Sequence, residues 1–106
     1  MTETEFLQRS EQVMGSIERA IDATGADIEP TRSGNVLTLE LGDGSKVVIN
    51  SQAPMQQMWV AGRNGAFHSA WRDGAWIDTR DGSELFAALS RLVSAQGGEP
   101  VVLGPA

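Results

Sequence analysis

The sequence predicts an α+β fold in which one helix at each end of the chain packs on the same face of an antiparallel β-sheet. Apolar residues recur every three, four or seven positions near both termini, which is typical of helices that bury one side. Between these segments, short stretches alternate apolar and polar residues, as half-buried strands do. Glycine-containing turns separate the stretches. We therefore expect a meander with one apolar face, covered by both helices.

The first predicted helix covers residues 4–23. Thr2 or Thr4 can cap its start, because a threonine hydroxyl accepts a hydrogen bond from a free backbone N–H of the first turn. Thr24 and Gly25 follow its last turn, and glycine readily adopts the left-handed conformation that ends a helix. The face that this helix buries is formed by residues at helical spacing: Phe6, Ser10, Val13, Ile17, Ala20 and Ile21.

A series of short strands follows the first helix. Residues 26–34 form a polar connection that contains a proline, so the first strand is expected at residues 36–41, where three leucines share one side. The remaining strands are expected at residues 46–50, 57–61, 66–71 and 76–78, with turns at 42–45, 63–65 and 73–74.

The strand at residues 57–61 decides what the open face of the sheet carries. Met58 and Val60 make the better core pair, which leaves Gln57 and Trp59 on the face that no helix covers. A register shift of one residue would reverse this arrangement, burying Trp59 and exposing Met58. We expect Trp59 to be exposed, where a tryptophan is a common anchor for a protein partner.

The second predicted helix covers residues 82–96. Asp81 with Glu84 three residues later fits a capping box at its start, with aspartate in place of serine or threonine. Gly97 and Gly98 end the helix. Its buried stripe consists of Leu85, Phe86, Leu89, Leu92 and Val93. The apolar residues 100–103 that follow are expected to pack back on the domain.

Composition limits the class of protein. The chain has 106 residues, which suits a single domain over residues 1–106, and a formal net charge of −6. This charge argues against nucleic acid or an anionic membrane as a partner. There is no cysteine, which excludes disulfides, thiolate metal sites and a cysteine nucleophile. No apolar run approaches the ~20 residues that span a bilayer, and the acidic start is not a targeting peptide, so a cytoplasmic location is expected.

The negative charge is concentrated near the N-terminus. Residues 1–29 hold seven acidic and two basic residues, whereas the rest of the chain holds seven acidic and six basic ones. On a helix, Glu11, Glu18 and Asp22 fall within about 40° of one another and roughly 120° from the centre of the apolar face. The first helix therefore carries a ridge of carboxylates along one edge. Carboxylates suit hard cations, although a row of charges is more commonly a solvated helix surface.

The segment Asn50–Ala61 resembles the signature of the frataxin family, in particular its bacterial CyaY branch. It reads Asn-Ser-Gln-Ala-Pro-Met-Gln-Gln-Met-Trp-Val-Ala, and the family pattern is Asn-x-Gln-x-Pro-x-x-Gln, then an aliphatic residue, Trp, an aliphatic residue and Ala. The hairpin at residues 35–46, the segment Gly65–His68 and Trp76 are similar as well. The resemblance implies a frataxin-like two-layer sandwich, with the N- and C-terminal helices on one face of a strongly twisted antiparallel sheet.

The resemblance also implies a function, that of an iron-binding adaptor or regulator of iron–sulfur cluster assembly. Such a protein docks on the cysteine desulfurase through an acidic ridge and an exposed tryptophan face of the sheet, and it works with the scaffold machinery. It is a monomer that metal can drive to oligomerise. Iron, as Fe²⁺ or Fe³⁺, would be bound weakly by the carboxylates that match the family's acidic ridge: Glu3, Glu11, Glu18, Asp22, Asp27 and Glu29. The partner-binding residues would be Asn50, Gln52, Gln57 and Trp59. Arg19 and Ala23 stand where bacterial relatives commonly have a second acid, so the ridge is thinned.

Two other functions stay open. The chain could be a protein-interaction module with no physiological metal, in which the ridge serves only docking. A ferroxidase is less in keeping with the sequence, because no clustered His and Glu residues suggest a di-iron centre. No nucleotide-binding or hydrolase motif is present either, so the chain is not expected to be an enzyme. His68 is the only histidine, and a sheet-surface position is its simplest interpretation.

Overall fold

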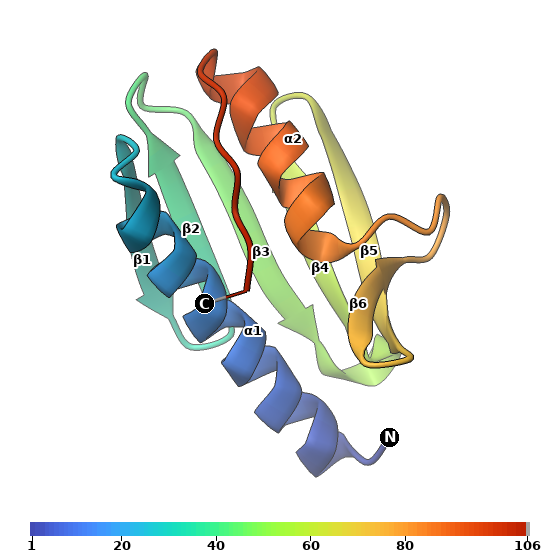
Figure 1. Cartoon of the computed structure of the whole chain (residues 1–106). Helices are drawn as coiled ribbons and strands as arrows, with labels where there is room; N and C mark the ends of the chain where they lie inside the picture. Colours follow the sequence, from blue (N-terminus) through green and yellow to red (C-terminus); the bar gives the residue numbers. More distant parts are fainter. Residues whose placement is uncertain (106) are drawn as a thin grey trace.

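The chain runs from helix to sheet to helix in a computed structural model that describes residues 1–105. The helices α1 (Glu3–Thr24) and α2 (Leu85–Gly97) form one layer, and an antiparallel sheet forms the other (Figure 1). The strands pair in sequence order: β1 (Ile28–Ser33), β2 (Val36–Leu41), β3 (Lys46–Gln52), β4 (Gln57–Gly62), β5 (Gly65–Arg72) and β6 (Ala75–Asp78). A short 3₁₀ helix, η1 (Ala53–Met55), joins β3 to β4. The predicted α+β sandwich is confirmed.

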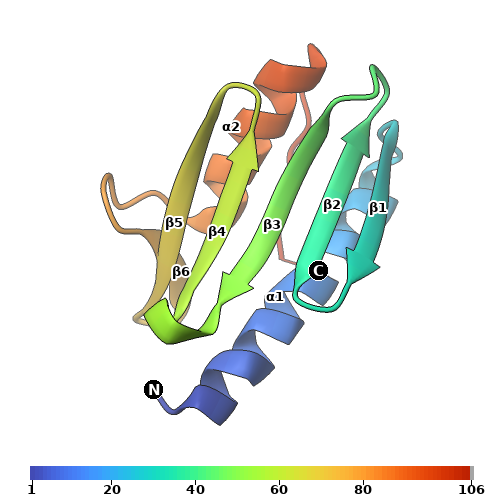
Figure 2. The same ribbon diagram turned by 180° about the vertical axis from the view of Figure 1, so that it is seen from behind.

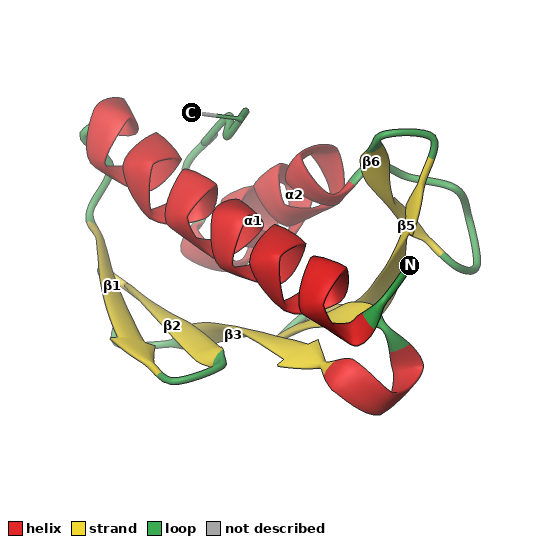
Figure 3. Cartoon of the chain, turned by 90° about the horizontal axis from the view of Figure 1, so that it is seen from below, coloured by secondary structure: helices red, strands yellow, loops and turns green. Residues whose placement is uncertain are grey.

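Both helices cover the same face of the sheet. Seen along the layers, α1 and α2 lie on one side, and the sheet twists strongly so that β5 and β6 turn up beside α2 (Figure 3). From behind, the strands lie in the foreground and both helices lie beyond them (Figure 2). The sheet therefore has one face that packs on helices and one open face, as the apolar alternation of its strands predicted.

The N-terminus of α1 is closed by a capping box. The Thr2 hydroxyl accepts a hydrogen bond from the Glu5 backbone N–H at 3.1 Å, and the Glu5 carboxylate accepts one from the Thr2 N–H at 3.4 Å. Thr2, rather than Thr4, is the cap. At the other end Gly25 has a φ of 67°, a left-handed conformation that glycine adopts without strain. The predicted helix is confirmed, one residue longer at each end.

Residues 28–33 are a strand, so the expectation of a polar connection over residues 26–34 was wrong. β1 pairs with β2 from Ile28 opposite Leu41 to Ser33 opposite Val36. Pro30 and the charged residues around it disfavour a strand in isolation. An edge strand tolerates a proline, because one of its sides needs no backbone donor, and the tight turn at Gly34 brings β1 back along β2.

The second helix begins three residues later than expected, and its cap is different. Glu84 is the N-cap: its carboxylate accepts hydrogen bonds from the backbone N–H groups of Phe86 at 2.8 Å and Ala87 at 3.2 Å. Asp81 instead accepts a hydrogen bond from the Ser83 N–H and belongs to the preceding turn. The capping box predicted for Asp81 and Glu84 was therefore wrong, because Gly82 has a φ of 77° and the chain is still turning there.

The core lies between the two layers. On β4, Met58 and Val60 point into it and are at most 1% exposed, which confirms the predicted register. Phe6 of α1 meets Trp76 of β6 edge to face, with ring centroids 5.9 Å apart. Within the described residues, the largest fully buried side chains come from both helices and from β2, β3 and β4: Phe6, Met14, Ile17, Leu37, Leu39, Val47, Ile49, Met58, Val60, Leu85, Leu89 and Val93.

The segment after α2 packs back on the domain, as predicted. It runs back beside α2 toward the middle of α1 (Figure 1). Leu103 is only 3% exposed and joins the core. Two serine hydroxyls of α2 bind its backbone: Ser94 accepts a hydrogen bond from the Val101 N–H, and Ser90 accepts one from the Leu103 N–H, both at 2.8 Å.

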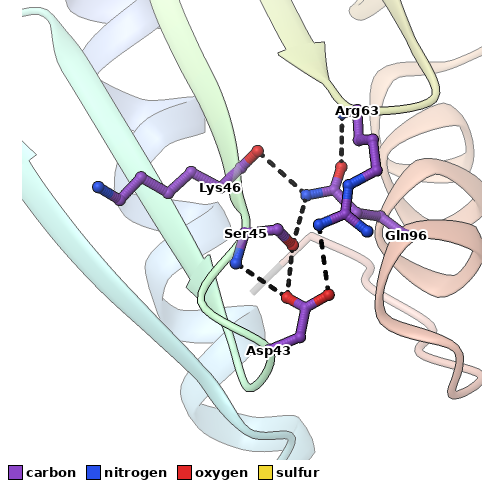
Figure 4. Close-up of polar contacts among 5 residues, drawn as sticks. All are labelled: Asp43, Ser45, Lys46, Arg63 and Gln96. Carbon is purple, nitrogen blue, oxygen red and sulfur yellow. Dashed lines mark hydrogen bonds and ion pairs between the residues drawn. The ribbon is translucent and has the colours of Figure 1, made fainter.

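A buried glutamine ties α2 to two turns of the sheet. Gln96 accepts a hydrogen bond from the Arg63 N–H through its Oε1 at 2.8 Å (Figure 4). Its Nε2 donates to the Ser45 hydroxyl at 2.8 Å and to the Lys46 carbonyl at 3.1 Å. Asp43 completes the cluster by accepting from Ser45. One side chain of α2 thereby contacts both the β2–β3 and the β4–β5 turns.

Candidate functional site

The carboxylates of Glu11 and Glu18 converge on an arginine of β1. Arg32 donates from Nη1 to Glu18 Oε1 at 3.1 Å, and its Nη2 is ion-paired with Glu11 Oε2. The Arg32 Nε also donates to the Gly34 carbonyl at 2.9 Å. Arg32 can reach α1 because it pairs with the buried Leu37, so its side chain points to the helix-covered face of the sheet. The ridge predicted on α1 is therefore partly neutralised from the neighbouring layer.

Asp22 and Asp27 lie at the far end of the same edge. Asp22 is exposed in the last turns of α1. Asp27 lies just before β1, and its Oδ2 is 2.5 Å from where a Cβ at Gly42 would be, so its carboxylate rests against the β2–β3 turn. Together with Asp43 and Glu99 it lines a hollow of about 260 Å³ between that turn and the end of α2.

Glu29 points to the opposite face of the sheet from Arg32. It lies directly opposite Glu40 of β2, and both side chains are exposed. Successive side chains of a strand alternate between faces, and Glu29 is three residues from Arg32, so Glu29 belongs to the open face. Glu40 in turn lies opposite Lys46 of β3. Glu29 thus adds to a mixed row of charges across three strands.

Glu3 lies at the other end of α1. It is exposed in the first turn, eight residues before Glu11, which corresponds to a rise of about 12 Å along the helix axis. Across residues 1–105, no three His, Cys, Asp or Glu side chains are grouped so that they could hold a metal ion. The predicted ligands therefore form a dispersed acidic edge rather than a single coordination site.

The four predicted partner-binding residues come together on the open face of the sheet. Asn50 lies opposite Trp59, and Gln52 lies opposite Gln57. The side chains are linked in pairs: Gln52 donates to Asn50 Oδ1 at 2.5 Å, and the Trp59 indole N–H donates to Gln57 Oε1 at 3.0 Å. All four are partly exposed. They form a small amide-rich platform around one tryptophan.

His68 belongs to this platform as well. It lies opposite Trp59 on β5, and the two rings stack with centroids 4.2 Å apart and an interplanar angle of 9°. This confirms the sheet-surface interpretation of His68. The stack holds the Trp59 side chain flat and half-buried, so the predicted exposure of Trp59 is only partial. The alternation along β4 and β5 indicates which face Trp59 and His68 occupy. It does not show that the two residues lie opposite each other, because this depends on how β4 and β5 pair.

Arg32 contacts two predicted site residues, Glu11 and Glu18, and the sequence did not reveal it. It falls in the segment expected to be a connection, where a lone arginine carries no signal. The pattern Ile28, Pro30, Arg32 does alternate with polar residues, and this weak period-two signal was the only indication of a strand. Placing Arg32 against α1 requires both the strand and its pairing with β2.

Nearly the whole chain, including the residues described above, matches one known protein family. The sequence profile of the frataxin-like domain matches residues 1–99, nearly the whole chain. The chain belongs to the frataxin family. Among curated frataxins, the iron–sulfur cluster assembly protein CyaY of Paraburkholderia phymatum is 50% identical over 105 residues, covering 99% of this chain and 100% of the relative. The resemblance stated for Asn50–Ala61 is thereby confirmed.

Solved frataxin structures have the same fold. A frataxin from Psychromonas ingrahamii, a member of the CyaY family, superposes with a TM-score of 0.89 at 36% identity, covering 96% of this chain and 97% of that one. A trimeric frataxin from Saccharomyces cerevisiae, complexed with ferrous iron, superposes with a TM-score of 0.68 at 26% identity, covering 93% and 88% of the two chains.

Within residues 1–105, no helix is long and apolar enough to cross a membrane.

Proposed function

We propose that this frataxin is a non-enzymatic, iron-binding adaptor of iron–sulfur cluster assembly. Its curated relatives are named for that assembly, and the yeast frataxin holds ferrous iron. The observation that carries the proposal is the platform of Asn50, Gln52, Gln57 and Trp59: four residues of the family signature lie side by side on a sheet face that no element covers. Uncovered aromatic and amide groups suit a protein partner, for which we propose the cysteine desulfurase and its scaffold.

Iron is the cargo in this proposal, bound along the acidic edge of α1 and β1. Separate carboxylates with hydrated coordination shells suit Fe²⁺ and Fe³⁺, but they discriminate poorly against other divalent cations. Weak binding at a dispersed edge suits a protein that passes its metal on. The carboxylates of α1 lie in the helix layer and the platform lies on the open face of the sheet, which among the proposed ligands also carries Glu29. Metal on α1 and a partner on the platform can therefore be bound at the same time.

A titration of Fe²⁺ into ¹⁵N-labelled protein under anaerobic conditions tests the metal half. We expect amide signals of residues 3–29 to broaden first, while signals of the platform stay sharp. Broadening scattered over the whole chain, or none below millimolar iron, would favour an interaction module without a physiological metal. This second function, an interaction module without a metal, is considered because residues 1–105 contain no group of three possible metal ligands.

Calorimetric binding to a purified bacterial cysteine desulfurase tests the docking half. We expect Trp59→Ala to weaken binding at least tenfold, because truncated aromatic anchors typically cost that much. Leu7→Ala is the matched control, since Leu7 is 48% exposed on α1, away from the platform. Equal affinities of the two variants would remove the platform from the proposal.

We further propose that the protein is a monomer without iron and can assemble when iron is bound. The trimeric yeast frataxin with ferrous iron motivates this step. Light scattering of the protein before and after anaerobic Fe²⁺ addition measures the mass directly. A trimer already present in metal-free protein would contradict it.

A further inference from the structure

The guanidinium of Arg32 lies between the carboxylates of Glu11 and Glu18. Glu11 and Glu18 are seven residues apart on α1, a rise of about 10 Å, yet both carboxylates bend toward the same guanidinium. Each of the three guanidinium nitrogens of Arg32 donates one hydrogen bond, Nη1 and Nη2 to the glutamates and Nε to the Gly34 carbonyl. A planar guanidinium held at three points is a preorganised counter-ion.

We infer that Arg32 is an intramolecular cation that competes with metal for the middle of the acidic edge. The inference rests on the proposed iron-binding function and specifies how that site is regulated. Arg32 holds one oxygen of each carboxylate, Glu11 Oε2 and Glu18 Oε1, and its positive charge repels a second cation close by. A metal ion therefore binds Glu11 and Glu18 more weakly while the Arg32 side chain stays in place. Metal binding and the ion pairs between β1 and α1 therefore weaken each other.

The surroundings allow such an exchange. The Arg32 side chain is 22% exposed, whereas those of Glu11 and Glu18 are 70% and 37% exposed. Ion pairs with this much solvent contact are weak and are screened by salt, so the guanidinium can be displaced without unfolding. The ion pairs of Arg32 involve only Glu11 and Glu18 among the carboxylates of the edge. Glu3 and Asp22, at the two ends of α1, can therefore attract a cation while Arg32 stays in place.

The test compares Mn²⁺ binding to Arg32→Gln and Arg63→Gln. Both variants lose one positive charge, and Arg63 also pairs with an acid, Asp43, at 3.5 Å, but far from Glu11. Paramagnetic broadening of amide signals gives the site and the affinity, and the spectrum itself reports whether the variant is folded. We expect Arg32→Gln to bind Mn²⁺ about 3–10-fold more tightly, with new broadening around residues 11 and 18, and Arg63→Gln to change less than about twofold.

A further variant separates the local effect from net charge. Adding Glu11→Gln and Glu18→Gln to Arg32→Gln should return the Mn²⁺ affinity to the wild-type value. Equal tightening in Arg32→Gln and Arg63→Gln would overturn the role of Arg32 and leave the acidic edge standing as a metal site. No broadening of residues 3–29 in any protein would overturn the proposed metal site itself.

Discussion

Met58 and Trp59 are neighbours in β4, yet the sheet gives them opposite surroundings. Met58 is fully buried between the layers, whereas Trp59 is half-buried on the open face against His68. We expect Met58→Ala to lower the free energy of unfolding by about 2–5 kcal/mol, because it leaves a core cavity. Trp59→Ala should cost less, about 1–2 kcal/mol, because it removes a stack on His68 and the burial of only part of one side chain. Urea unfolding measures both, and a larger loss for Trp59→Ala would contradict the register of β4.

Glu5 links the stability of the first helix to pH. The backbone N–H of Thr2, and then its side chain, hydrogen-bond the Glu5 carboxylate and lower its pKa from the ordinary value of 4.5. A carboxyl whose pKa is lower in the folded than in the unfolded state stabilises the fold above about pH 4.5, and this contribution is lost as the pH falls through the folded pKa.

We therefore expect Glu5→Gln to make the protein less sensitive to acid. The variant has no carboxyl to protonate at this position, so its melting temperature should fall less than that of the wild type between pH 6 and pH 3. Circular dichroism melts at these two pH values give the difference. An identical acid-induced decrease in both proteins would show that the capping box does not couple to protonation.

At the scale of the element, the start of α2 depends on one side chain. The Glu84 carboxylate accepts two hydrogen bonds from first-turn N–H groups that would otherwise lack partners. Glu84→Ala should lower the free energy of unfolding by about 1 kcal/mol. Asp81→Ala is the control, because Asp81 serves only the preceding turn, and it should cost less. The reverse order in urea unfolding would place the cap at Asp81 after all.

The elements are joined at the scale of the whole molecule by Gln96. Its side chain is 6% exposed and bonds to both the β2–β3 and β4–β5 turns (Figure 4). Replacing Gln96 with leucine removes the partner of the part-buried Arg63 N–H and Lys46 carbonyl, at a cost of about 1 kcal/mol. Gln8→Leu, an exposed change of the same type on α1, should be nearly neutral. Equal melting temperatures of the two variants would show that the tie contributes nothing.

The sequence predicted the platform of the candidate site more completely than its acidic edge. The platform of Asn50, Gln52, Gln57 and Trp59 could be predicted from the family signature and the alternation of β4, because residues two apart on a strand share a face. Helical spacing predicted the acidic edge on α1, where it relates Glu11 to Glu18, and the family resemblance added Asp27 and Glu29. The orientation of Glu29 toward the open face could not be predicted from the sequence, because it depends on residues 28–33 forming a strand.

The sequence by itself determined both helices, five of the six strands, the buried register of β4 and the family. These features depend on spacing and turn chemistry within a few residues, which any segment carries with it. Only the tertiary structure decided that β1 is a strand, that His68 stacks on Trp59 and that Arg32 lies between Glu11 and Glu18. Each of these contacts joins different elements, and its energy exists only after the chain has closed the loops between them.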